Sequence, residues 1–183
     1  LSAVQNSWFD ESADAPSVRL ANAMQEDSAE MRKSILPGLI DAAKRNLSRG
    51  LVDLAIFEEG SVFTPSKQVS AGSALPLGNV RPDEDQLNTL NSEIPLQPKH
   101  LAVLLTGSRV PHQVGQKEVA ANYQDAINSV LIVANSVAAE LTIRQAHRAG
   151  FHPGRCAEFV SADGSVIAVA GELNPALALE NDL

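Results

Sequence analysis

The residues of this 183-residue chain that could perform chemistry are few and widely spaced. Its four histidines lie at no spacing typical of metal ligands: His100, His112, His147 and His152. Structural and catalytic zinc sites usually combine closely spaced histidines with cysteines or carboxylates. The chain also lacks both common glycine-rich phosphate loops. We therefore predict no metal-ligating and no phosphate-binding residues.

The single cysteine, Cys156, is the one candidate nucleophile of its type. A reactive thiol needs a nearby base and an electropositive setting, and His152 and Arg155 are close in sequence. However, Cys156 opens an alternating run and is expected to face inward, so we favour a buried structural thiol. The alternative is a small independent enzyme or ligand-binding module that uses Cys156 and the segment FHPGRC. In that segment Pro153-Gly154 predicts a tight turn, after which Arg155 can reach backbone carbonyls or a carboxylate.

The adjacent carboxylates Glu58 and Glu59 do not form a catalytic pair. On a strand, neighbouring side chains point to opposite faces, so these two cannot share a substrate proton.

The charge distribution limits the partners that the chain can bind. A net charge of −8 argues against broad electrostatic binding to nucleic acid, and one cysteine fits a reducing compartment. Cations concentrate between Arg32 and Arg49, where they complement a helix C-terminus; a basic patch for a partner is the less favoured alternative. No apolar run is long enough to span a bilayer. We expect a cytoplasmic protein with no membrane partner.

Helical periodicity is clearest between Ser34 and Gly50. Ser34 is a plausible N-cap, Pro37 falls in the first turn, and Gly50 can adopt the left-handed closing conformation. Apolar residues recur at helical spacing on one face: Leu36, Leu39, Ile40, Ala43 and Leu47.

The elements on either side of this helix are predicted from shorter patterns. We expect a short strand over Val4–Phe9 and a hairpin or bulged strand in VDLAIFEEGSVF around Gly60. The segment 64–98 is rich in Pro, Gly, Ser and Asn and predicts an excursion with at most one short helix near Asp83–Leu90. HLAVLLTG, from His100 to Gly107, is typical of a strand covered on both faces.

The C-terminal half alternates between helix and strand patterns. Asn122 can cap a helix that packs on the sheet containing His100–Gly107, and LTIRQAH follows as a strand. Two alternating runs meet at Asp163-Gly164, the strongest hairpin signal in the chain. Asn174-Pro175 then predicts a final helix. These elements predict an α+β fold with a largely antiparallel sheet.

Three stretches resemble one family. In order and spacing, residues 34–63 (SILPGLIDAAKRNLSRGLVDLAIFEEGSVF), FHPGRCAEF and GELNP resemble the latter part of the beta chain of bacterial phenylalanyl-tRNA synthetase. VRLANAM, Val18–Met24, is similar to the segment that precedes the helix in the same family. The resemblance covers most of Val18–Leu179, although 64–98 is too variable to count.

The resemblance implies a class II aminoacyl-tRNA synthetase-like fold, an antiparallel sheet flanked by helices. It also implies that residues 1–183 form a single catalytic-like domain, truncated at both ends, with a variable excursion at about 64–98. The resemblance implies that such a domain is inactive by itself. Where the catalytic relative has an arginine after its Gly-x-Val-aromatic strand, this chain has Thr64-Pro65, and GELNPALALE carries no Lys or Arg. Asn174 stands where the family usually has histidine.

The function that the resemblance implies is a non-catalytic scaffold that supports the alpha–beta interface in tRNA(Phe) aminoacylation. Its partners would be the synthetase alpha chain, the remainder of the beta chain, and tRNA(Phe) through the whole enzyme. ATP and Mg would belong to the parent enzyme, and the isolated fragment is expected to self-associate. Whether the basic segment meets protein or tRNA stays open. The structural or interface candidates are Pro37, Gly38, Arg45, Asn46, Gly50, Glu58, Gly60, Pro153, Gly154, Arg155, Gly171, Glu172 and Pro175.

Overall fold

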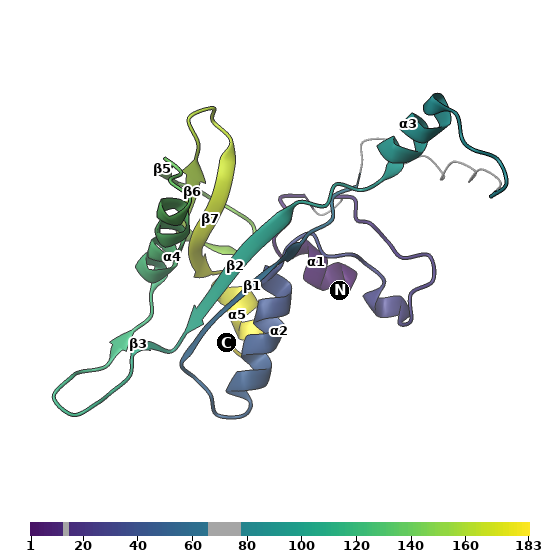
Figure 1. Cartoon of the computed structure of the whole chain (residues 1–183). Coiled ribbons are helices and arrows are strands. Elements are labelled where there is room, and N and C mark those ends of the chain that lie inside the picture. Colours follow the sequence, from purple (N-terminus) through teal and green to yellow (C-terminus); the bar gives the residue numbers. More distant parts are fainter. Residues whose placement is uncertain (13–14, 66–77) are drawn as a thin grey trace.

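The computed structural model describes residues 1–12, 15–65 and 78–183 as an α+β fold (Figure 1). All strand pairs in it are antiparallel, as predicted, but the described strands divide into three small sheets. The first pairs β1 (Leu54–Ser61) with β2 (Lys99–Thr106), the second β3 (Ser108–Val110) with β4 (Val119–Ala120), and the third has the order β5 (Thr142–Gln145), β6 (Phe151–Val160), β7 (Val166–Leu173). The helices are α1 (Ala3–Ser7), a 3-10 turn (Glu26–Ser28), α2 (Leu36–Leu47), α3 (Glu84–Glu93), α4 (Tyr123–Ser136) and α5 (Pro175–Glu180).

Helix α2 forms where its periodicity predicts it. Ile35 occupies the N-cap position that we assigned to Ser34, but the Ser34 hydroxyl still accepts a hydrogen bond from the Leu36 N–H at 3.2 Å. Pro37 lies in the first turn, where a missing N–H leaves no helical bond unmade. After the last turn, Gly50 adopts a φ of 82°, so the predicted left-handed closure is confirmed.

The predicted strand at Val4–Phe9 is wrong, because this segment forms helix α1. Ser2 and Gln5 cap the helix reciprocally: the Ser2 hydroxyl accepts from the Gln5 N–H, and the Gln5 side chain accepts from the Ser2 N–H. Two otherwise unsatisfied backbone donors gain partners in this way, which favours the helix over an unpaired strand.

Strand β1 is one continuous strand and not a hairpin. It pairs with β2 along its whole length, from Leu54 opposite Thr106 to Ser61 opposite Lys99. Glu58 and Glu59 lie on opposite faces of β1, as predicted. Between the two strands the chain includes α3, close to its predicted position; residues 66–77 of the expected excursion lie outside the described residues.

Helix α4 begins at the predicted cap, Asn122, whose side chain accepts from the Gln124 N–H at 2.8 Å. Its packing differs from our expectation, because it lies mainly against β7 and only partly against β2 (Figure 1). The hairpin of β6 and β7 turns at Asp163-Gly164, and Asn174 caps α5 through the Ala176 N–H; both were predicted. Among the described residues, none of the helices combines the length and apolar character needed to cross a membrane.

The core is built where α2 covers one face of the β1–β2 sheet. Ile35, Leu39 and Val62 form a buried cluster, and side chains of the sheet pack against it. The opposite face of the same two strands is left to α4, which covers it only in part.

Candidate functional site

An open apolar groove of about 340 Å³ lies between the β1–β2 sheet and α4. Its lining is aliphatic and aromatic apart from Ser129: Ala55, Ile56 and Phe57 from β1, Leu101 and Val103 from β2, and Ser129, Ile132 and Val133 from α4. Phe57 lies opposite Val103 and is 73% exposed. The expectation that β2 is covered on both faces is therefore wrong, since α4 leaves this face open.

Three of the predicted candidates in the first half, Gly38, Glu58 and Gly60, meet on the covered side of β1. Arg32 reaches across Gly60, pairs with Glu58 and donates from Nε to the Ser61 carbonyl at 2.9 Å. A Cβ at Gly60 would meet the Arg32 guanidinium and push it aside, so the glycine lets Arg32 keep this position, and Gly38 faces Glu58 from α2. This cluster ties the segment before α2 to the strand that follows it. Sequence reasoning missed Arg32 because 26 residues separate it from Glu58.

The end of α2 holds the remaining candidates of this half. The Asn46 side chain donates to the Ala42 carbonyl at 2.8 Å, while the Asn46 carbonyl accepts from the Leu51 N–H. Arg45 is exposed. Of the basic segment, Lys44 pairs with Asp182 at 3.2 Å and Lys33 pairs with Asp10. Much of this segment therefore neutralises acids of the same chain.

The segment FHPGRC is part of strand β6, so the predicted turn at Pro153-Gly154 is wrong. Between Phe151 and Cys156 the register against β7 shifts, which places extra residues on β6. Proline has no N–H to give to a sheet and is tolerated at such irregular positions. The Gly154 N–H bonds instead to His152 Nδ1 at 3.0 Å.

Beyond this irregularity, the motifs FHPGRCAEF and GELNP lie side by side on the paired strands β6 and β7. Arg155 Nη1 pairs with Glu172 Oε2 at 2.6 Å, so of the two contacts predicted for this arginine the structure shows the carboxylate. Gly171 lies opposite Cys156, so close that a Cβ would be 2.9 Å from the Cys156 Cα and even nearer the Arg155 carbonyl oxygen. Pro175 then begins α5. Thus Arg155, Gly171 and Glu172 form one contact, whereas none of the predicted candidates lines the groove of the described chain.

A buried carboxylate organises the far side of this sheet. Glu158, only 5% exposed, accepts from Arg144 Nε at 2.8 Å and also from Arg148, which reaches on to Glu11 at 3.2 Å. The hydrogen bond from Arg144, followed by that from Arg148, holds the pKa of Glu158 below its ordinary value. These partners lie on different elements, so sequence spacing gave no sign of them.

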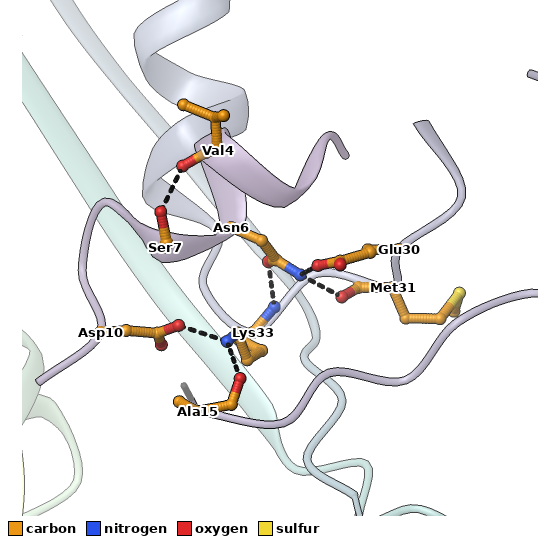
Figure 2. A network of polar contacts seen from close by, with 8 residues as sticks. All are labelled: Val4, Asn6, Ser7, Asp10, Ala15, Glu30, Met31 and Lys33. Carbon is orange, nitrogen blue, oxygen red and sulfur yellow. Dashed lines mark hydrogen bonds and ion pairs between the residues drawn. The ribbon is translucent and has the colours of Figure 1, made fainter. Parts of the chain in front are cut away.

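Figure 2 shows a second polar network that fixes the N-terminal segment. The buried Asn6 amide donates to Glu30 Oε2 at 2.9 Å and to the Met31 carbonyl at 2.8 Å, and its oxygen accepts from the Lys33 N–H. The bond from Asn6 lowers the pKa of Glu30. All these bonds join α1 to the segment before α2, which is the pattern of a structural staple.

Cys156 is buried, and its surroundings keep the thiol protonated. Burial is the main cause that raises its pKa above the ordinary value, and Glu158 adds to the effect. Since the thiolate is the nucleophile, this is the environment of an inert cysteine. Within the described ranges, histidine, cysteine and carboxylate side chains form no group of three that could hold a metal ion.

Comparison with known proteins identifies the family. The family model for the phenylalanyl tRNA synthetase beta chain CLM domain matches residues 1–183. The chain belongs to this family. The resemblance stated from residues 34–63, FHPGRCAEF and GELNP is thereby confirmed.

Individual members agree. Over 185 residues the chain is 44% identical to the phenylalanine–tRNA ligase beta subunit of Leifsonia xyli subsp. xyli. This match covers 99% of this chain and 22% of the relative. Against the beta subunits of Streptomyces avermitilis and Thermobifida fusca the identities are 38% and 36%, each over 86% of this chain and 19% of the relative. The chain therefore spans about a fifth of the length of the curated relatives it matches.

Proposed function

We propose that this chain is a non-catalytic scaffold domain of the beta subunit of a phenylalanine–tRNA ligase, and that it supports assembly with the alpha chain. Membership of this family supports a phenylalanine–tRNA ligase as the enzyme of which the chain is a part. The observation that carries the scaffold role is the apolar groove between β1–β2 and α4, in which Phe57 is largely exposed.

The character of the groove distinguishes assembly from catalysis. An active site brings polar groups with shifted pKa values together in a concave pocket, whereas an assembly surface exposes apolar side chains that a partner covers. The groove has one hydroxyl, Ser129, among apolar residues. The competing idea, an independent enzyme that uses Cys156, is weakened by the burial of that thiol.

The proposal extends to the rest of the parent enzyme. Residues 1–183 would form one catalytic-like domain with a class II synthetase-like fold, an idea that the antiparallel pairing of its strands supports. ATP, Mg and the chemistry would reside elsewhere in the enzyme, and tRNA(Phe) would be bound by the assembled enzyme in the cytoplasm. Self-association of the isolated fragment stays a prediction.

The test is assembly of the beta chain with the alpha chain, measured by sedimentation velocity. Phe57→Asp places a charge in the groove and is expected to weaken the complex about tenfold or more, because a buried, unpaired charge is costly. Val114→Asp is the matched control, since Val114 is fully exposed on the loop between β3 and β4. Equal affinity of wild type and Phe57→Asp, or no complex at all, would contradict the scaffold role.

A further inference from the structure

The two walls of the apolar groove belong to different parts of the fold. We call α2, β1 and β2 the first body, and α4 with β5, β6 and β7 the second body (Figure 1). Phe57 and Leu101 line the groove from the first body, whereas Ile132 and Val133 line it from the second. Helix α4 packs mainly on β7 of its own body and contacts β2 only in part. The width of the groove therefore depends on how the two bodies are held relative to one another.

Residues 5–11, which we call the clasp, are fixed to the first body by polar contacts. The Gln5 side-chain amide donates to Asp41 Oδ2 of α2 at 2.8 Å. Asn6, only 2% exposed, bonds to the segment just before α2, where Lys33 also pairs with Asp10 (Figure 2). Because unpaired polar groups are costly when buried, the Asn6 amide holds the clasp in this position.

The other end of the clasp contacts the second body. The Phe9 ring meets the Phe151 ring of β6 edge to face, with centroids 5.6 Å apart and planes at 63°. Glu11 pairs with Arg148 at 3.2 Å, and Arg148 in turn bonds to the buried Glu158. Edge-to-face rings attract each other beyond the effect of the area that they bury, whereas an ion pair as exposed as that of Glu11 contributes little. Phe9 is therefore the stronger of the two attachments.

The turn before β6 leaves room for the Phe9 ring. Gly150 adopts a φ of 79° there, in the region that favours glycine. A Cβ at Gly150 would lie 2.4 Å from Phe9 Cδ1 and 2.7 Å from the Trp8 carbonyl oxygen. The Gly150 carbonyl also accepts from the Asn174 N–H at 2.9 Å, so the turn that receives Phe9 is bonded to the residue that follows β7. The clasp thus meets a fixed part of the second body.

An ion pair near the chain end also links the bodies. Lys44 of α2 pairs with Asp182, which follows α5, at 3.2 Å. The two side chains are 45% and 78% exposed, so solvent screens this pair and it contributes little. The clasp, with its buried amide and its aromatic contact, is the firmer of these two links.

We propose that the clasp sets the separation of the groove walls, and that Phe9 is thereby a positioning residue for binding of the alpha chain. The identity of the partner rests on the function proposed above, whereas the link between the bodies follows from the contacts of the clasp itself. Packed side chains and hydrogen bonds of this kind can carry coupling between distant sites. Once Phe9 is removed, the walls lose their fixed separation and the groove fits its partner less well.

Phe9→Ala tests the coupling at a distance from the groove. It removes the ring that contacts β6 and leaves the bonds of Gln5 and Asn6 in place. In the full beta chain, we expect it to raise the dissociation constant of the alpha–beta complex about threefold or more. Val4→Ala is the matched control: it shortens an apolar side chain of α1 that is 62% exposed, and it should leave the dissociation constant unchanged. Phe9→Leu keeps most of the apolar volume, so it tests the proposal even if Phe9→Ala does not fold, and it should raise the dissociation constant about twofold.

Two measurements separate this coupling from a general loss of stability. Hydrogen–deuterium exchange of the beta chain should become faster around residues 148–151 in Phe9→Ala, while β1 and β2 keep their protection. In a chain that already carries Phe57→Asp, Phe9→Ala should weaken the complex less than it does alone, because the contact in the groove is already lost.

The outcomes distinguish the clasp from the scaffold function. If Phe9→Ala speeds exchange at residues 148–151 and leaves the affinity for the alpha chain unchanged, the role of the clasp is overturned and the scaffold function stands. Equal losses of affinity with and without Phe57→Asp would mean that the clasp acts elsewhere than on the groove, which also overturns the proposal. If Phe57→Asp by itself leaves the affinity unchanged, the scaffold function fails and the coupling fails with it.

Discussion

Gly171→Ala should destabilise the fold by about 1–3 kcal/mol, because the added methyl group would overlap the neighbouring strand. Its Cβ would lie 2.9 Å from the Cys156 Cα and nearer still to the Arg155 carbonyl oxygen. Both atoms belong to the backbone of β6, so they cannot move aside as the end of a flexible side chain can. The clash is relieved only if β6 and β7 separate, which strains the ladder around Cys156 and Gly171.

Thermal unfolding of the chain followed by circular dichroism measures this cost. At about 3 °C per kcal/mol for a domain of this size, the midpoint should fall by roughly 3–9 °C. Gly154→Ala is the matched control on β6, because a Cβ there meets only the His152 ring, at ordinary distances of 3.7 Å from Cε1 and 3.8 Å from Nδ1. It should leave the midpoint unchanged or raise it slightly through the entropy of the unfolded chain. Equal midpoints for the two variants would show that β6 accommodates the added methyl group without cost.

Three further predictions concern buried and paired groups. Gly60→Ala should displace Arg32 from Glu58 and lower the urea midpoint of unfolding. The same substitution should cost little stability in a chain that already carries Arg32→Ala; if the two losses of stability are additive, the effect of Gly60→Ala does not act through Arg32. Cys156 should react with Ellman's reagent only after urea unfolds the chain, and rapid labelling of the native form would contradict its burial. The pKa of Glu158 is lowered in the folded state, so its carboxylate contributes fully to the free energy of unfolding above the unfolded-state pKa of about 4.3. This contribution is lost as pH falls through the lower folded-state pKa. The stability gap between wild type and Glu158→Gln should therefore narrow as urea titrations move from pH 7 towards pH 3; a constant gap would contradict this.

Structure that depends on local signals could be predicted from the sequence. The closure of α2 at Gly50, the cap of α4 at Asn122 and the turn at Asp163-Gly164 each involve residues within a few positions of one another. Their hydrogen bonds are available before any tertiary contact forms, so pattern and propensity suffice. The family resemblance was equally accessible, because it depends on ordered motifs.

Structure that depends on distant partners could not be predicted. FHPGRC contains Pro153-Gly154, a strong turn signal, but pairing with β7 draws the segment into a strand. The ion pair of Arg32 with Glu58 joins residues that no spacing rule connects. The groove is absent from the sequence prediction for a different reason: the apolar run of β2 predicts a strand covered on both faces, whereas α4 packs mainly on β7. Exposure of an apolar face is a property of the packing, and the strand pattern alone does not reveal it.

The central claim, that the domain supports assembly and takes no part in chemistry, is tested most directly by phenylalanine-dependent ATP–pyrophosphate exchange. The alpha chain is titrated with beta chain carrying Phe57→Asp or no substitution, and the rate is followed to saturation. If the domain only supports assembly, the variant keeps the maximal rate of the wild type and reaches half-saturation at a beta-chain concentration about tenfold or more higher. A lower maximal rate at an unchanged half-saturation concentration would show that the groove serves the chemical step, and would contradict the account.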